Sequence, residues 1–121
     1  MAAGSAARVT LAGLHLSTGY LLALGVTLAV EVPVVAAFYP GRRRRMAVVC
    51  AAATTVTHLL LVFGFPRILP RAISPLWFGE AFATLGEAGA YWIADRQVGR
   101  ALVASAVANT CSYGVGLLLL W

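Results

Sequence analysis

Acidic and histidine side chains lie inside strongly apolar stretches of this 121-residue chain, where they could carry protons or bind cations. Glu31, Glu80 and Glu87 are three of the four acidic residues, and His58 lies in an apolar stretch of its own. An acidic side chain at the centre of a bilayer costs about 2.5–3.5 kcal/mol on insertion scales. Three such residues in so short a chain are candidates for function, although a hydrogen-bonded core of protonated carboxyls would also account for them.

The spacing of these residues predicts two polar layers. Glu80 and Glu87 are seven residues apart and share one helix face. At 1.5 Å per residue from the expected helix ends, Glu31, Glu87 and Asn109 lie about 10–12 Å from one membrane surface. His58 and Glu80 lie about 6–8 Å from the opposite surface on the same count. The sequence thus predicts a proton or cation pathway through these five residues, because an apolar setting disfavours an ionised carboxyl and suits proton exchange.

A metal site is an alternative use of the outer layer. His58, Glu80 and His15 would form a credible ligand set for zinc or iron, and two facing histidines could ligate a haem. Either site would require His15 to lie within the membrane. The cofactor therefore remains open, and no catalytic residue is predicted, because no H-E-x-x-H, G-x-S-x-G or P-loop motif is present.

The composition favours an integral membrane protein. Hydrophobic residues make up 61% of the chain, charged residues 11%, and the mean hydropathy is +0.88. These values exclude a disordered tail, a nucleic-acid-binding domain and most soluble enzymes. We expect an all-α, antiparallel bundle of four transmembrane helices that forms a single domain over residues 1–121. The expected spans are residues 11–39, 46–63, 76–94 and 101–120.

Two features of the first span affect the site. It is longer than the about 20 residues that a bilayer requires, so it should tilt, kink or project from the membrane. Pro33 removes a backbone donor two residues after Glu31, and a kinked helix with free carbonyls beside a carboxylate is typical of cation sites in transporters.

The arginines predict the orientation. Arg42, Arg43, Arg44 and Arg45 form one run between two apolar stretches, and Arg96 and Arg100 follow the third span. Arg8, Arg67 and Arg71 belong to the opposite side, so the positive-inside rule places both termini outside. The arginine run could also hold anionic lipid headgroups. Tyr39, Tyr91 and Trp92 are expected at the arginine-rich interface, and Trp77 and Trp121 at the other.

Four short motifs carry a resemblance. They are the E-x-P of Glu31–Pro33, the T-H of Thr57–His58, the E-x6-E of Glu80–Glu87 and the A-N-x-x-S of Ala108–Ser112. In these motifs and in layout the chain resembles small, functionally uncharacterised four-span bacterial inner-membrane proteins. The resemblance implies a fold and no activity, and no internal repeat is evident.

The function that we expect is transport. The chain would be an ion-translocating membrane protein or an accessory transport subunit in the inner membrane of a bacterium, which the Arg- and Ala-rich composition indicates. The alternatives are a metal-dependent membrane enzyme or redox protein, and a structural subunit of a larger complex. Four short helices enclose little space, so we expect a homo-oligomer or a membrane complex, with the lipid bilayer and no nucleic acid as partner.

Overall fold

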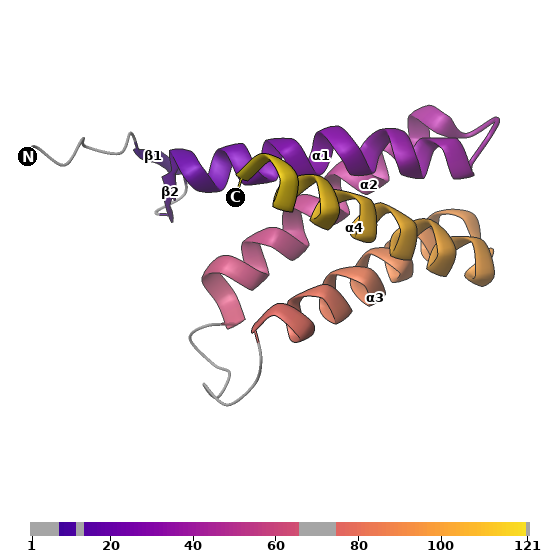
Figure 1. The fold of residues 1–121 in the computed structure, drawn as a ribbon. Coiled ribbons are helices and arrows are strands. Elements are labelled where there is room, and N and C mark those ends of the chain that lie inside the picture. Colours follow the sequence, from indigo (N-terminus) through magenta and orange to yellow (C-terminus); the bar gives the residue numbers. More distant parts are fainter. Residues whose placement is uncertain (1–7, 12–13, 66–74, 121) are drawn as a thin grey trace, which may run out of the picture.

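A computed structural model describes residues 8–11, 14–65 and 75–120, with side chains over 17–65 and 77–119. In this part of the chain, a short antiparallel hairpin precedes four α-helices (Figure 1). The strands are β1 (Arg8–Leu11) and β2 (Leu14–Ser17). The helices are α1 (Thr18–Phe38), α2 (Arg43–Leu59), the π-helical turn η1 (Leu60–Gly64) that continues α2, α3 (Pro75–Asp95) and α4 (Val98–Leu120).

The first helix begins at Thr18, and the predicted start near Leu11 is wrong. Ser17 has an extended backbone, and its hydroxyl accepts a hydrogen bond from the Tyr20 backbone N–H at 3.1 Å, which makes it an N-cap. The residues before it pair as strands instead of continuing the helix. At 21 residues, α1 is about 32 Å long, close to the ~30 Å hydrocarbon core of a bilayer. It therefore does not need the large tilt or projection that the sequence suggests, and it is helical on both sides of Pro33.

Tight turns connect the helices at one end of the bundle. Gly41 has a φ of 87° between α1 and α2, a conformation that glycine adopts without a steric cost. Arg96 takes the same left-handed region at a φ of 58° between α3 and α4, and its guanidinium lies 5.2 Å from the ring centre of Trp92. The last three helices begin and end within a few residues of the apolar stretches that the sequence marks.

The helices form a closed cycle of contacts. α1 packs against α2 and α4, and α3 packs against the same two helices. The molecule therefore consists of two helical hairpins, α1–α2 and α3–α4, with both connections at the same end (Figure 1). Away from that end, the end of α2 and the start of α3 diverge from α4 (Figure 1), whereas Phe63 of η1 still packs edge-on against Tyr20 of α1, with ring centres 5.5 Å apart.

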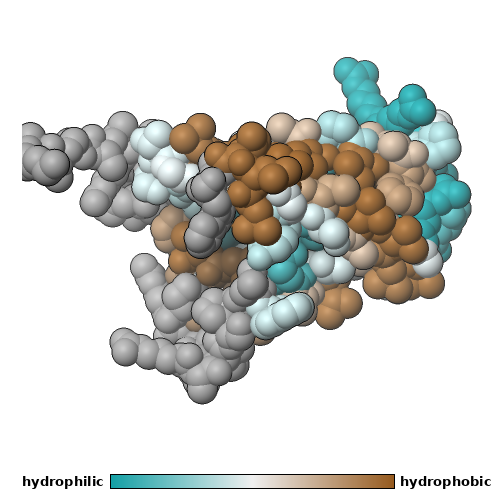
Figure 2. Space-filling model, in the orientation of Figure 1, coloured by the Kyte–Doolittle hydropathy of each residue, from teal (hydrophilic) through white to brown (hydrophobic). Residues whose placement is uncertain are grey.

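The distribution of polarity is inverted relative to that of a soluble domain. Large apolar side chains face outward. Val48, Leu85, Ile93 and Leu118, for example, are 64–83% exposed. The buried set includes Glu31, Thr54, Thr57, Glu87, Ser105, Asn109 and Ser112. Figure 2 shows hydrophobic atoms over the sides of α1 and α4, and hydrophilic atoms gathered at the end with the connections. An apolar exterior around a polar interior is the arrangement that lipid favours.

Three helices are long and apolar enough to cross a bilayer: Thr18–Phe38, Arg43–Gly64 and Val98–Leu119. α3 has the same length as α1 but carries Glu80 and Glu87, and it is not among the three. The described part of the chain thus has the character of a small, helical, multi-pass membrane protein.

Candidate functional site: a buried carboxyl network beneath a vestibule

Six buried polar side chains from all four helices form the carboxyl network at the centre of the bundle. They are Glu31, Thr54, Thr57, Glu87, Asn109 and Ser112, and each is at most 8% exposed. The two carboxyls come from α1 and α3, and the groups that bind them come from α2 and α4. The network therefore joins all four helices through hydrogen bonds.

Glu31 is held by two hydroxyls. The Thr54 hydroxyl donates to Glu31 Oε2 at 2.8 Å, and the Ser112 hydroxyl donates to Glu31 Oε1 at 2.7 Å. Because only 1% of Glu31 is exposed, these hydroxyls replace the water that the carboxyl would otherwise bind.

Glu87 is held in the same way by one hydroxyl and one amide. The Thr57 hydroxyl donates to Glu87 Oε1 at 2.9 Å, and Asn109 Nδ2 donates to Glu87 Oε2 at 2.8 Å. Asn109 is oriented by the Ser105 carbonyl, which accepts from Nδ2 at 2.9 Å. Glu87 has no exposed surface.

Two hydroxyls in the network each face two acceptors. Thr57 Oγ1 lies 2.9 Å from Glu87 Oε1 and 3.0 Å from the Thr54 carbonyl oxygen. Ser112 Oγ lies 2.7 Å from Glu31 Oε1 and 3.1 Å from the Asn109 carbonyl oxygen. A hydroxyl has one proton, so it serves one acceptor at a time. It donates to an ionised carboxyl, whereas it accepts from a protonated carboxyl and donates to the carbonyl. The network can thus hold either protonation state without moving a helix.

The two hairpins are equivalent in this network, although the sequence shows no repeat. Glu31 accepts from Thr54 of its own hairpin and from Ser112 of the other, whereas Glu87 accepts from Asn109 of its own and from Thr57 of the other. Exchanging the hairpins therefore maps this pattern onto itself. The four buried residues of α2 (Met46, Cys50, Thr54 and Thr57) are spaced by four, four and three positions, and four of the six buried residues of α4 (Ala101, Ser105, Asn109 and Ser112) have the same spacing.

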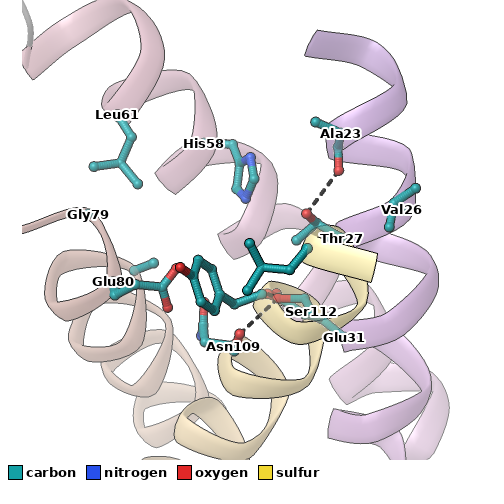
Figure 3. A pocket seen from close by; sticks show the side chains of 14 residues that line it. Ala23, Val26, Thr27, Glu31, His58, Leu61, Gly79, Glu80, Asn109 and Ser112 are labelled. Atoms are coloured by element: carbon teal, nitrogen blue, oxygen red, sulfur yellow. Dashed lines mark hydrogen bonds between the residues drawn. The ribbon is translucent and has the colours of Figure 1, made fainter. Parts of the chain in front are cut away.

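A cavity of about 340 Å³, which we call the vestibule, extends from the carboxyl network toward the end opposite the connections. All four helices contribute to it, and Glu31, Asn109 and Ser112 form its deep part. His58 and Glu80 point into the same space from α2 and α3 (Figure 3). The vestibule therefore brings the outer pair of predicted residues into one cavity with Glu31 and Asn109, whereas Glu87 does not line it.

An apolar core closes the other side of the network. It consists of Val35, Tyr39, Met46, Cys50, Tyr91, Ala101, Ala104 and Ala108, each at most 1% exposed. Tyr39 and Tyr91 are buried inside the bundle, so their rings do not face outward, and their predicted depth at the arginine-rich interface stays a prediction. Trp77 and Trp92 are exposed, at 76% and 43%.

The connections carry the arginines beyond this core. Arg42 Nη1 lies 2.7 Å from Asp95 Oδ1 and joins the two hairpins, and Arg100 lies 5.7 Å from the ring centre of Tyr39. The run of four arginines, together with Gly41, Val48 and Val49, lines an open surface groove. The arginine run, Arg96 and Arg100 thus lie at one end of the bundle. Arg67, Arg71 and Trp121 lie outside the described residues, and so does the side chain of Arg8.

The predicted metal ligands lie only partly within the described residues. Among the described residues, no three or more His, Cys, Asp or Glu side chains are grouped as metal ligands would be. His15 lies in β2, and its side chain is outside the described part. The third ligand of the predicted His58, Glu80 and His15 set therefore cannot be placed.

Sequence reasoning placed both carboxyls and Asn109 in one layer, but it did not predict which hydroxyls bind which carboxyl. Thr54, Thr57 and Ser112 are small hydroxyl residues, which are common in membrane helices. The available signal was spacing, since α2 and α4 each place a donor pair three residues apart at the depth of a glutamate.

Comparison with known proteins adds no relative. The chain matches no protein family model, no curated protein sequence and no solved structure. Its function is therefore inferred from the contacts described above.

Proposed function

We propose that this protein moves protons or small cations across a membrane, and that Glu31 and Glu87 are the groups that carry them. The observation that supports this most is the one-sided access to the carboxyl network. The vestibule reaches Glu31 from one end of the bundle, and a buried apolar core separates the network from the other end. A carrier must hold its ion in a site that is open to one side at a time, and this geometry fits that requirement.

The proposal includes α3 as a fourth membrane span. α3 packs between α2 and α4, which are both long and apolar enough to cross. Its outward side chains include Leu85 and Ile93, each 64% exposed, while Glu87 is buried inside. Its carboxyls lower its mean hydropathy, but they face the bundle or the vestibule and not the lipid.

Transport by the purified protein tests the proposal. The protein is reconstituted into liposomes that contain a pH-sensitive dye, and a pH gradient is imposed under a clamped membrane potential. We expect proton movement above that of protein-free liposomes, or movement of a monovalent cation in the matching assay. Liposomes that remain as tight as protein-free ones to protons and to monovalent cations would overturn the proposed function.

A structural subunit is the second candidate, and the saturation of the carboxyls favours it. All four carboxyl oxygens of Glu31 and Glu87 have a donor, as they would in a network that only joins helices. In either case the small enclosed volume and the apolar exterior support a homo-oligomer or a subunit of a larger membrane complex. Native mass spectrometry from detergent should then show more than one chain per particle.

We further propose that the arginine end faces the cytoplasm of a bacterium and that both termini are outside. Six of the nine basic residues lie at the two connections, and positively charged loops are retained on the cytoplasmic side. Alkaline phosphatase fused to the C-terminus should be active in cells, and a fluorescent protein that folds only in the cytoplasm should be dark there. The opposite pattern would reverse the orientation.

The arginine run should bind anionic lipid headgroups. Arg43 begins α2, so the run adds its charge to the positive end of a helix dipole. Replacing Arg42 to Arg45 by glutamine should remove most of the thermal stabilisation by phosphatidylglycerol, since each basic side chain near a charged surface contributes about 1 kcal/mol. Thermal unfolding in nanodiscs measures this effect, with phosphatidylcholine as the control lipid. Equal stabilisation of both proteins by phosphatidylglycerol would assign the run to topology alone.

A further inference from the structure

We infer that the vestibule binds a small organic cation, an ammonium group on an apolar body, with Glu80 as its counter-ion. This inference names a ligand class for the proposed transport site and rests on that function for its purpose. It starts from two groups that the carboxyl network does not use. Among the described residues, neither His58 nor Glu80 has a hydrogen-bond partner, and both line the vestibule.

The charges around the vestibule select a cation. The lining side chains include the carboxyls of Glu31 and Glu80 together with His58, and none of the described lining residues is an arginine. The chain as a whole carries a formal charge of +5, and the arginines with described side chains lie at the far end of the bundle. The negative character of the vestibule is thus local and opposite to that of the whole protein.

The wall chemistry favours an organic cation over a metal ion. Both oxygens of Glu31 already accept hydrogen bonds, so Glu80 is the one lining carboxyl without a donor among the described residues. Divalent cations require several oxygen ligands, and one free carboxylate does not supply them. Most of the remaining wall is apolar, with Leu61 and Leu117 opposite small residues and the aromatic Tyr113. An aromatic ring and apolar walls suit an alkylammonium group, and the volume of about 340 Å³ is in the range of small-molecule sites.

The hairpin equivalence also points to the vestibule. The two hairpins match in the carboxyl network but differ in the wall above it. Glu80 of α3 corresponds to Leu24 of α1, and His58 of α2 corresponds to Tyr113 of α4. Glu80, the carboxyl that the network leaves free, therefore lies at a position where the two hairpins differ, and the network itself does not account for it.

Equilibrium binding in nanodiscs tests the inference. The probes are choline and tetraethylammonium, with the uncharged isostere of choline, in which carbon replaces the quaternary nitrogen, as the control ligand. We expect calorimetric binding of the cations and not of the isostere. Glu80→Gln should weaken choline binding by at least about tenfold, which corresponds to the loss of one favourable charge contact.

A pair of glycine variants tests the location. Gly116 lines the vestibule, Gly114 does not, and a Cβ at either position meets no atom within 4 Å. Gly116→Leu should fill the cavity and remove choline binding, whereas Gly114→Leu on the same helix should bind like the wild type. Equal binding of the isostere, or unchanged binding by Gly116→Leu, would overturn the inference. Proton flux without cation binding contradicts this inference alone, and cation binding without any flux contradicts the proposed function alone.

Discussion

Replacing Glu31 by glutamine is expected to reduce proton movement in liposomes by at least about a hundredfold, the lower end of what a positioned proton-transfer group contributes. Glutamine has the size of glutamate, and its amide oxygen can still accept from Thr54 or Ser112, which donate to Glu31 at 2.8 and 2.7 Å. It cannot take up or release a proton. Glu31 is the carboxyl of the network that lines the vestibule, so an ion that enters from that side meets it first. Dye-reported proton influx measures the effect.

A second acid-to-amide change provides the control. Asp95 lies at the arginine end, where it pairs with Arg42 and contacts no member of the carboxyl network. Asp95→Asn should therefore keep most of the flux while removing the same kind of charge. Wild-type flux in the Glu31→Gln protein would assign the carboxyl network to helix packing and support the structural subunit. Glu87→Gln should resemble Glu31→Gln if both carboxyls carry the proton in turn.

Replacing Asn109 by leucine is expected to destabilise the bundle by about 1–3 kcal/mol. This loss exceeds the contribution of an average hydrogen bond between membrane helices, which is only about 0.6 kcal/mol. The range of about 1–3 kcal/mol applies because the change removes the Asn109 amide that donates to Glu87 Oε2 at 2.8 Å. Glu87 has no exposed surface, so water cannot replace this donor. Unfolding by increasing fractions of a denaturing detergent measures the difference.

A double replacement separates the lost bond from the unpaired carboxyl. When Glu87→Leu is combined with Asn109→Leu, both partners become apolar, and much of the loss should be recovered. Thr110→Leu serves as a control on the same helix, because Thr110 is exposed and contributes nothing to the carboxyl network. Strictly additive losses for Glu87→Leu and Asn109→Leu would show that the two side chains are not coupled.

The sequence was sufficient to predict most of the secondary structure. Apolar runs that are bounded by the arginine run, by the proline-rich stretch and by the turn at Arg96 located the last three helices to within a few residues. The prediction failed at Leu11 and at Leu14–Ser17, which lie in strands, because an apolar stretch suits a strand as well as a helix. Ser17, a good N-cap residue, was the available signal for the true start of α1.

Composition and depth also identified the buried carboxyls, but not the side chains that bind them. The three glutamates stand out because a carboxyl in an apolar span is costly, and the count of residues from the span ends placed Glu31, Glu87 and Asn109 at one level. The sequence did not show which threonine or serine binds which carboxyl, since hydroxyl residues are common in membrane helices. It also did not show that the rings of Tyr39 and Tyr91 face the core, because an aromatic residue near a span end suits an interface and a buried core equally well.

Apolar helices with acids inside them and an arginine-rich end can be recognised from the sequence, because each of these depends on residue type and on position along one helix. The pairing of donors with carboxyls, the equivalence of the two hairpins, and the vestibule that reaches Glu31 but not Glu87 become visible only in the folded bundle. These features depend on how four helices rotate and pack against one another. Apolar outer faces that are alike all round do not encode that rotation, so it emerges only when the polar side chains find partners across the bundle.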